Sequence, residues 1–275
     1  MLIAPTAVEL QSCVSAFWAS AAEPFSYARA RVLPSGAMHL AIRLDGSGVR
    51  LYDDERDADG RLIAHAVVAG TRDRHYLKDV RESSRSVGAM LLPGATRLLF
   101  GCGADALANR HVALSDLVGD AALRLQQALA AATSPARQIA LLQAFLRRRV
   151  RPVHGLNPQV AAAFAGLANG DRVATLAALS GCSHKRFIAQ FRDATGLAPK
   201  CYARVQRLQR ALAIGATTNW TDTALTAGYS DQAHLNREFR ALTGTTPQAW
   251  RAVAVPSSHH LRADNFVKDA ARARR

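Results

Sequence analysis

The chain contains a pattern that occurs twice near its C-terminal end, and this repeat restricts the possible folds more than any other feature. The first copy begins at Gly181 with Gly-Cys-Ser-His-Lys-Arg-Phe-Ile-Ala-Gln-Phe-Arg, and the second begins at Gly228 with Gly-Tyr-Ser-Asp-Gln-Ala-His-Leu-Asn-Arg-Glu-Phe-Arg. The two glycines are 47 positions apart, whereas Phe191 and Phe239 are 48 apart. We therefore expect one structural unit to occur twice, with one extra residue between the Ser and the Phe of the second copy.

Each copy has the pattern of a helix-turn-helix. Apolar residues at helical spacing predict a first helix over 173–180 in one copy and over 223–227 in the other. A glycine follows, which permits the positive φ of a sharp turn. Ser183 or Ser230 comes next, and each can cap a second helix by accepting a backbone N–H.

The second helix of each copy has an apolar face and a polar face. Its apolar residues are four apart, so they share the side that packs on the first helix. They are Phe187 and Phe191 in the first copy and Leu235 and Phe239 in the second. The opposite face suits the major groove of DNA, where arginine pairs with guanine and amide side chains pair with adenine. It includes Lys185, Arg186 and Gln190 in the first copy and Gln232, Asn236 and Arg237 in the second.

A long helix is expected between the two copies, from Pro199 to Ile214. At roughly 1.5 Å per residue it spans on the order of 20 Å. With the offsets of the two units added, this length can hold two helices one DNA turn apart, about 34 Å. Its apolar stripe consists of Tyr202, Val205, Leu208 and Leu212.

Three motifs of the second copy are close to a known family signature. They are Ala-Gly-Tyr-Ser-Asp-Gln-Ala-His-Leu-Asn-Arg-Glu-Phe-Arg at 227–240, Thr-Gly-Thr-Thr-Pro at 243–247 and Trp250-Arg251. The stretch from about 157 to 251 resembles the DNA-binding domain of AraC/XylS-type transcription regulators. The resemblance implies an all-α domain at 158–252 that binds double-stranded DNA sequence-specifically, with two recognition helices in successive major grooves.

The resemblance also implies which side chains contact DNA. In the first unit they are Ser183, His184, Lys185, Arg186, Ile188, Ala189 and Arg192. In the second unit they are Ser230, Gln232, Ala233, Asn236, Arg237 and Arg240. The first unit departs from the family, since Ile188 and Ala189 stand where many relatives have a polar residue and an arginine. Lys185 is then the better candidate for a base contact, although an apolar side chain can still touch a thymine methyl.

The charge distribution agrees with a nucleic-acid partner. The chain has a formal net charge of +14, and residues 158–252 hold 11 Lys and Arg against 5 Asp and Glu. The tail at 253–275 adds 5 Lys and Arg against 2 Asp and Glu, and we expect it to be disordered. A basic C-terminal end favours contact with the phosphate backbone.

The N-terminal residues 1–150 predict a small β-rich domain that becomes helical from about 115, so the whole chain belongs to the α+β class. Short strands bounded by turn residues favour an antiparallel sheet, sandwich or barrel. The expected strands are Tyr27–Leu33, Met38–Leu44, Val49–Tyr52, Arg61–Ala69, His75–Val80 and Ser86–Leu92. The helices after Ser115 can pack on this sheet or against a second copy. Residues 151–157 are expected to form the linker.

This N-terminal domain resembles sensor-like domains that precede such DNA-binding domains in bacterial regulators. The resemblance rests on the turn at 33–36, the stretch 88–99 and the segment 111–119. It implies a small-molecule effector of unknown identity or a role in association. Two alternatives remain open: an enzyme domain tethered to DNA, as in repair methyltransferases, and a purely structural half that dimerises or contacts RNA polymerase.

Signatures of other classes are weak. The four cysteines have no Cys-x-x-Cys spacing, which disfavours disulfides and zinc and fits a cytoplasmic protein. Cys102, between two glycines, can present a thiol, but no partner base is identifiable. His39, His65, His75 and His111 lack the His-x-His pairing of a metal-binding barrel. We expect a monomer or homodimer that is not an enzyme and has no metal or cofactor. Glu9 but no Lys or Arg precedes the apolar stretch 14–22, which disfavours an export signal. No uninterrupted apolar run is long enough to span a membrane, so we expect no membrane partner.

Overall fold

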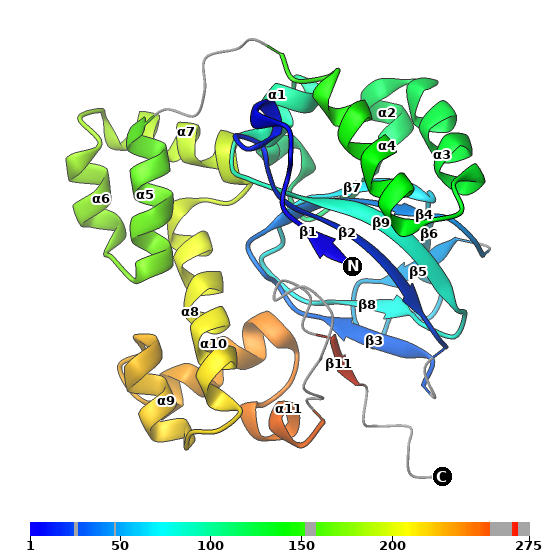
Figure 1. Cartoon of the computed structure of the whole chain (residues 1–275). Coiled ribbons are helices and arrows are strands. Elements are labelled where there is room, and N and C mark those ends of the chain that lie inside the picture. The colour runs from blue at the N-terminus through cyan, green and yellow to red at the C-terminus, as the bar shows by residue number, and fades with distance from the viewer. Residues whose placement is uncertain (25–26, 47, 152–157, 254–265, 269–275) are drawn as a thin grey trace.

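The chain folds into an N-terminal α+β domain and a C-terminal domain of helices, which confirms the predicted fold class (Figure 1). This computed structural model describes residues 1–24, 27–46, 48–151, 158–253 and 266–268. The linker expected at 151–157 lies outside the described residues apart from Arg151. The C-terminal domain extends along one side of the N-terminal domain, with the long helix α8 (Pro199–Gly215) at its middle (Figure 1).

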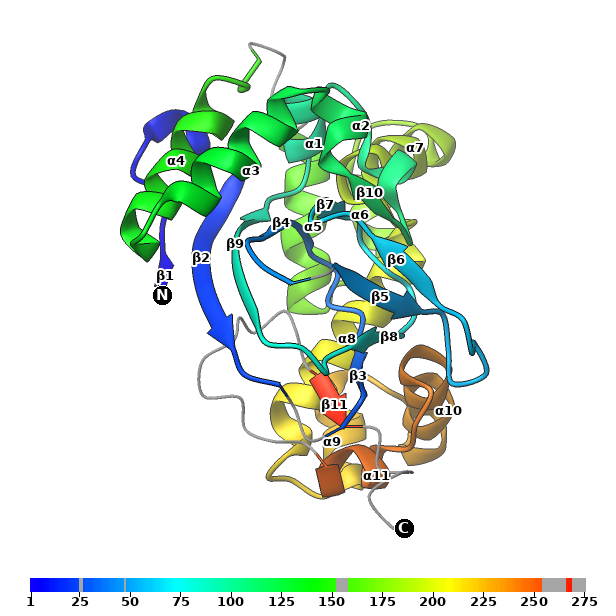
Figure 2. The same cartoon turned by 90° about the vertical axis from the view of Figure 1, so that its right-hand side faces the viewer.

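The first sheet of the N-terminal domain is antiparallel, with the order β1-β2-β9-β4-β7-β10. Its strands are β1 (Leu2–Ile3), β2 (Val14–Ala22), β9 (Ser84–Leu91), β4 (Met38–Arg43), β7 (Ala66–Ala69) and β10 (His111–Ala113). Because side chains alternate between the two faces of a strand, one face is apolar. The helices α3 (Ala121–Ala131) and α4 (Pro135–Arg147) cover this face, as Figure 2 shows. Packing within one subunit is thus the arrangement these helices adopt.

The second sheet has the order β11-β3-β8-β5-β6 and faces the first. Its strands are β11 (Phe266–Lys268), β3 (Arg29–Val32), β8 (Tyr76–Asp79), β5 (Val49–Tyr52) and β6 (Arg61–Ile63). The inner faces of the two sheets enclose a cavity of about 190 Å³. Trp18, His39, Tyr76, Lys78 and His111 are among the residues that line it.

Two predictions for these sheets need correction. The stretch Arg61–Ala69, expected as one strand, forms β6 and β7 in different sheets, because the chain crosses from one sheet to the other at residues 64–65. The tail, expected to be disordered, contributes β11, which pairs with β3. The rest of the tail after residue 253 lies outside the described residues. Strand β10 was not expected, because three residues carry too short a pattern to be recognised.

Short helical elements connect the sheets. They are η1 (Val8–Leu10), α1 (Ala95–Phe100), η2 (Ala104–Leu107) and α2 (Leu114–Val118). The apolar stretch 14–22 is β2, whose Phe17 is fully buried under the helical layer.

The C-terminal domain has two separate cores that share α8. Its other helices are α5 (Pro158–Asn169), α6 (Val173–Leu179), α7 (His184–Thr195), α9 (Trp220–Ala227), α10 (Gln232–Thr243) and α11 (Pro247–Val253). Tyr202 and Val205 of α8 belong to the first core, and Leu208 and Leu212 belong to the second. The predicted apolar stripe of the long helix therefore joins the two units.

Candidate nucleic-acid interface

The first recognition helix, α7, begins after a sharp turn at Gly181, where φ is +65°. Ser183 caps this helix as the sequence predicts, since its Oγ accepts a hydrogen bond from the backbone N–H of Arg186 at 3.3 Å. The helix ends at Thr195, and the next residue, Gly196, has a φ of +85°, in the left-handed region that glycine tolerates.

The second recognition helix, α10, is capped by Asp231 and not by Ser230, which corrects the prediction. The carboxylate Oδ1 of Asp231 accepts from the backbone N–H of His234 at 2.6 Å, and the Ser230 hydroxyl donates to Oδ2 at 3.1 Å. Asp231 stands four residues before Leu235, as Ser183 stands before Phe187. The cap is thus at the same distance from the first buried apolar residue in both units.

The two units share one register. The recognition helices start at residues 184 and 232 and end at 195 and 243, so both ends are 48 positions apart. The turns 180–182 and 228–230 have equal length. The extra residue expected in the second copy is therefore no insertion: the glycine moves one position within the turn.

Replacing Asp231 with alanine should destabilise the second unit at pH 7 but not in acid. The backbone N–H of His234, followed by the Ser230 hydroxyl, lowers the pKa of Asp231 below its ordinary 3.8. Such a carboxylate stabilises the fold above its unfolded pKa, and this contribution is lost as the pH falls through the folded pKa. The difference between the thermal melts of variant and wild type should therefore shrink as the pH falls below 3.8 and through the lowered folded pKa of Asp231. The control Ser183→Ala removes an uncharged cap, so the fall in melting temperature that it causes should not vary with pH. If the fall in melting temperature caused by Asp231→Ala is also independent of pH, the assignment of the Asp231 carboxylate as the cap of α10 is contradicted.

Most of the predicted DNA-contacting side chains lie on exposed surface. In α7 the exposed ones are Ser183, His184, Lys185, Arg186, Ala189 and Arg192. In α10 and its turn they are Ser230, Ala233, Asn236, Arg237 and Arg240. The other two are half-buried: Ile188 packs against the first core, and the Gln232 side-chain oxygen accepts from the Thr221 hydroxyl at 2.9 Å. In the described part of the chain, none of the five cations in these sets forms an ion pair, so they are available to an anion.

An ion-pair cluster that the sequence did not reveal fixes α10 on α8. Glu238 is on the inner side of α10, and its carboxylate binds Arg204 (Nε–Oε1 2.7 Å) and Arg207 (Nη2–Oε2 3.1 Å). Arg210 donates to the carbonyls of Ala168 at 3.1 Å and Ala227 at 3.4 Å, in the last turns of α5 and α9. The basic residues of α8 therefore orient the helices of both units. An acidic residue on a helix of otherwise basic character was the signal available in the sequence.

The N-terminal domain binds the C-terminal end of α7. The carbonyl oxygen of Thr195 accepts from the Thr71 hydroxyl at 2.8 Å, and that of Ala194 accepts from the backbone N–H of Gly94 at 2.8 Å. In both bonds the acceptor is one of the last backbone carbonyls of the helix, which have no partner within the helix itself.

The same domain binds the C-terminal end of α10 at equivalent positions. The carbonyl oxygen of Leu242 accepts from the backbone N–H of His75 at 2.8 Å, and that of Thr243 accepts from the Arg31 guanidinium at 3.3 Å. Residues 242 and 243 are 48 positions after 194 and 195. One domain thus holds α7 and α10 by corresponding carbonyls and leaves the exposed basic side chains of both helices uncovered.

Other kinds of site receive little support. Burial raises the pKa of the Cys102 thiol, which disfavours the thiolate that a nucleophilic cysteine needs. Among the described residues, no three His, Cys, Asp or Glu side chains gather closely enough to hold a metal. No helix in the described part of the chain has the length and apolar character to cross a bilayer.

Sequence comparison finds relatives for both domains. A family model described as a helix-turn-helix domain matches residues 176–252, and one described as a domain of unknown function (DUF6597) matches residues 3–113. No curated protein matches the chain.

Two solved structures are similar to the chain, one over 35% and the other over 86% of its length. The DNA-binding domain of AdpA, described as a global transcriptional factor and solved in complex with a target DNA, is 32% identical. The match covers 35% of this chain and 89% of that domain, with a TM-score of 0.31. ToxT from Vibrio cholerae is 9% identical over 86% of this chain and 98% of its own, with a TM-score of 0.45. The 32% identity over 89% of the AdpA domain, together with the helix-turn-helix match, places this chain and AdpA in one family.

Proposed function

Because the chain belongs to the AraC family of DNA-binding transcription regulators, we propose that α7 and α10 enter successive major grooves of one duplex. The observation that carries this proposal is the common register of the two helices. Each helix presents an exposed basic face, and the N-terminal domain binds the C-terminal end of each helix.

The side chains then divide between bases and phosphates. We assign base contacts to Asn236 and Arg237, which pair with adenine and guanine edges. Arg192 and Arg240 are 48 positions apart and exposed, which suits contacts to phosphates in both units. In the first unit Lys185 takes the polar base contact. Ala189 takes the apolar one, since Ile188 is partly used by the core.

Replacing Arg237 with alanine should weaken binding to the preferred site by about 1–3 kcal/mol and relax the preference at one base pair. Arg192→Ala should instead weaken all sequences alike and flatten the dependence of affinity on salt, because it removes a phosphate contact. Fluorescence anisotropy with a panel of single-base variants of the site, at stated salt concentrations, distinguishes the two. Unchanged specificity in Arg237→Ala would mean that the groove assignment of α10 is wrong.

Selection of bound sequences from a random DNA pool tests the whole proposal. The full-length protein should recover two blocks about one helical turn apart. A single block would assign base reading to one unit only, and the absence of enrichment would contradict sequence-specific binding by this form of the protein.

We further propose that the N-terminal domain modulates DNA binding through the segment 71–76. Thr71 donates a hydrogen bond to the end of α7, and the backbone N–H of His75 donates one to the end of α10. Arg72 and Tyr76 of the same segment contact His111, which lines the cavity. One short segment therefore touches both recognition helices and the wall of the cavity. A change in the cavity has a direct physical route to both units.

The proposed setting is the cytoplasm of a bacterium. All four cysteines are free thiols, which suits a reducing compartment. One chain contains both DNA-reading units, so a monomer suffices for a two-block site, and a second copy or RNA polymerase would bind elsewhere on the surface.

A further inference from the structure

We propose that the groove between α3 and α4 is a docking surface for an acidic amphipathic helix of another protein. The groove has a volume of about 660 Å³ and lies in the helical layer of the N-terminal domain. None of its lining residues lines the cavity between the two sheets or belongs to a recognition helix. The inference is independent of the proposed function, since binding to the groove can be measured without DNA.

The shape of the groove follows from the helical hairpin that forms it. Three residues, 132–134, join α3 to α4, so the two helices run side by side in opposite directions, as Figures 1 and 2 show. The helices line the groove with Ala121, Arg124, Leu125 and Ala128 from α3 and with Leu141, Phe145 and Arg148 from α4. These positions are i, i+3, i+4 and i+7 in α3 and i, i+4 and i+7 in α4, so each set lies on one face of its helix. Because seven residues span about 10 Å, a third helix of two to three turns fits along the two faces.

The groove has an apolar floor and a basic rim. Leu125 and Phe145 on the floor are buried. Arg124, Arg148 and Arg151 also line the groove and are exposed. Within the described part of the chain, no acidic side chain lines it. A complementary partner therefore offers apolar side chains that are flanked by carboxylates.

A fourth arginine, Arg149, is half-buried in the wall of the groove. Its guanidinium lies over the ring of Phe145, 4.8 Å from the ring centroid. Burial, and after it the positive charges of Arg151, Arg124 and Arg148, lowers the pKa of Arg149 below its ordinary value. The charges that act on this guanidinium are therefore all cationic, and a carboxylate in the groove would offset their repulsion.

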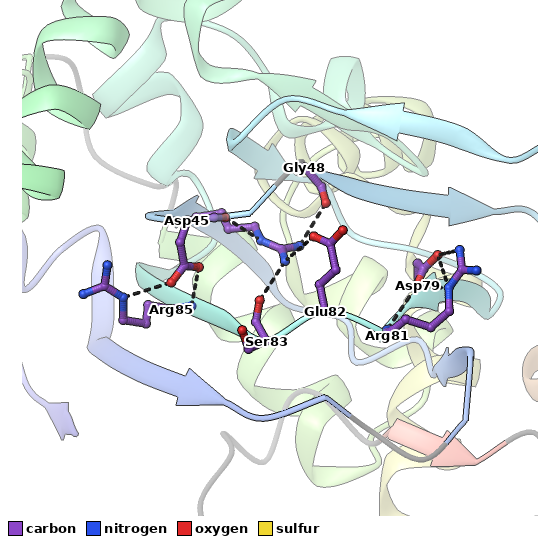
Figure 3. A network of polar contacts seen from close by, with 8 residues as sticks. Asp45, Gly48, Asp79, Arg81, Glu82, Ser83 and Arg85 are labelled. Carbon is purple, nitrogen blue, oxygen red and sulfur yellow. Dashed lines mark hydrogen bonds and ion pairs between the residues drawn. The ribbon is translucent and has the colours of Figure 1, made fainter.

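Several other arginines of this domain have carboxylate partners, as Figure 3 shows for two of them. Arg81 binds Asp79 (Nε–Oδ1 3.1 Å), and Arg85 binds Asp45 (Nε–Oδ2 2.9 Å). Among the residues that the structure describes, none of the four groove arginines forms an ion pair. A partly buried charge without a partner is unfavourable, so an anionic partner gives this cluster a physical reason.

The helix dipole accounts for only part of the cluster. Arg148 and Arg149 follow the C-terminal end of α4, where a cation is favourable without any partner. Arg124 is close to the N-terminal end of α3, where a cation is unfavourable. The arginine on the α3 side of the groove therefore needs another explanation, which an acidic partner supplies.

A second copy of this chain is a poor occupant. Among the described helices of eight residues or more, acidic residues outnumber basic ones only in α9, whose single charged residue is Asp222. Two copies that met through this groove would bring the arginines of both together, which like charge disfavours. The occupant is therefore a different protein.

The groove also adjoins the element that holds the first recognition helix. Leu99 of α1 is part of the wall, and the backbone N–H of Arg151 donates to the carbonyl of Leu98 at 3.0 Å. Arg97 of the same helix pairs with Asp193 of α7 (Nε–Oδ2 2.6 Å). A protein in the groove thus contacts an element that also contacts α7.

Fluorescence anisotropy with the full-length protein and a labelled peptide of about 14 residues tests this surface. The peptide has leucine at positions i, i+3, i+4 and i+7, glutamate on both flanks of this stripe and alanine elsewhere. It should bind with a Kd of about 100 μM or below. A peptide with glutamine in place of each glutamate should bind at least about tenfold more weakly, because it keeps the apolar stripe and lacks the charge.

Variants at exposed positions locate the binding site. The double variant Arg124→Gln, Arg148→Gln removes one cation from each helix of the groove and should weaken the peptide about tenfold. The control Arg137→Gln, at an exposed arginine of α4 outside the groove, should not change it. The double variant Lys185→Gln, Arg237→Gln removes two cations from the recognition helices and should also leave peptide binding unchanged.

A further variant, Ala128→Leu, keeps the charge but fills part of the groove, and it should weaken the peptide at least about tenfold. Because leucine is a good helix former and this position is exposed, this variant decides the question even if the double arginine variant fails to fold. The inference is overturned if the glutamine peptide binds equally well or if the groove variants retain full affinity. Displacement of the peptide by an equal concentration of inorganic tripolyphosphate would also overturn it, since the groove would then be a site for phosphates.

Discussion

Replacing Phe239 with alanine is expected to destabilise the second helix-turn-helix unit by about 3–5 kcal/mol and to abolish reading of one block of the DNA site. The Phe239 ring is fully buried and contacts the rings of Trp220 and Trp250 edge-on, with centroids 6.0 and 6.2 Å away. Its removal leaves a cavity in the core that this unit forms with α8 and with Leu33 of the N-terminal domain. The first unit should stay folded, because its buried residues form a separate cluster.

The tryptophans make this prediction directly measurable. Two of the three, Trp220 and Trp250, lie in the second core, the third is Trp18, and the first unit has none. In a Trp18→Phe background, urea unfolding followed by tryptophan fluorescence therefore reports the second unit. Phe239→Ala should lower its midpoint, and the matched Phe191→Ala should leave it unchanged while abolishing the other DNA block. Equal shifts in both variants would mean that the two units unfold as one.

The helices of the C-terminal domain are predictable because their core residues are close in sequence and follow the helical period. The long helix was expected from Pro199 to Ile214 and ends at Gly215, and Ser183 caps α7 as expected. Ser230 and Asp231 are both good capping residues, so local chemistry alone does not choose between them. The spacing to the apolar residues does distinguish them, because Ser183 is four residues before Phe187 and only Asp231 is four residues before Leu235.

Contacts between the domains could not be predicted from the pattern. The acceptors at the ends of α7 and α10 are backbone carbonyls, which every residue has, and their donors are far away in sequence. The split of Arg61–Ala69 into two strands had the same cause, because only the pairing partners reveal that the chain changes sheets. Apolar periodicity identifies which face is buried but not what buries it.

The double variant Thr71→Val, Arg97→Met is expected to weaken the docking of the first unit by about 1–4 kcal/mol and its binding to a two-block site about tenfold. Thr71→Val leaves the buried carbonyl of Thr195 without its partner, which costs about 1–3 kcal/mol. Arg97 pairs with Asp193 (Nε–Oδ2 2.6 Å), but its side chain is 55% exposed, so this pair adds at most about 1 kcal/mol.

Affinity should fall because the N-terminal domain pre-orients the recognition helices and leaves their DNA-facing side chains exposed. Loosening one unit restores freedom that must be lost again when both bind one duplex. A single-block DNA needs no such orientation, so anisotropy with it should give the same Kd for variant and wild type. The control Arg81→Met removes another exposed arginine, one that pairs with Asp79 within the N-terminal domain, and should change neither affinity. Tighter two-block binding by the double variant would reverse the conclusion: docking would then inhibit the protein, and an effector would act by releasing it.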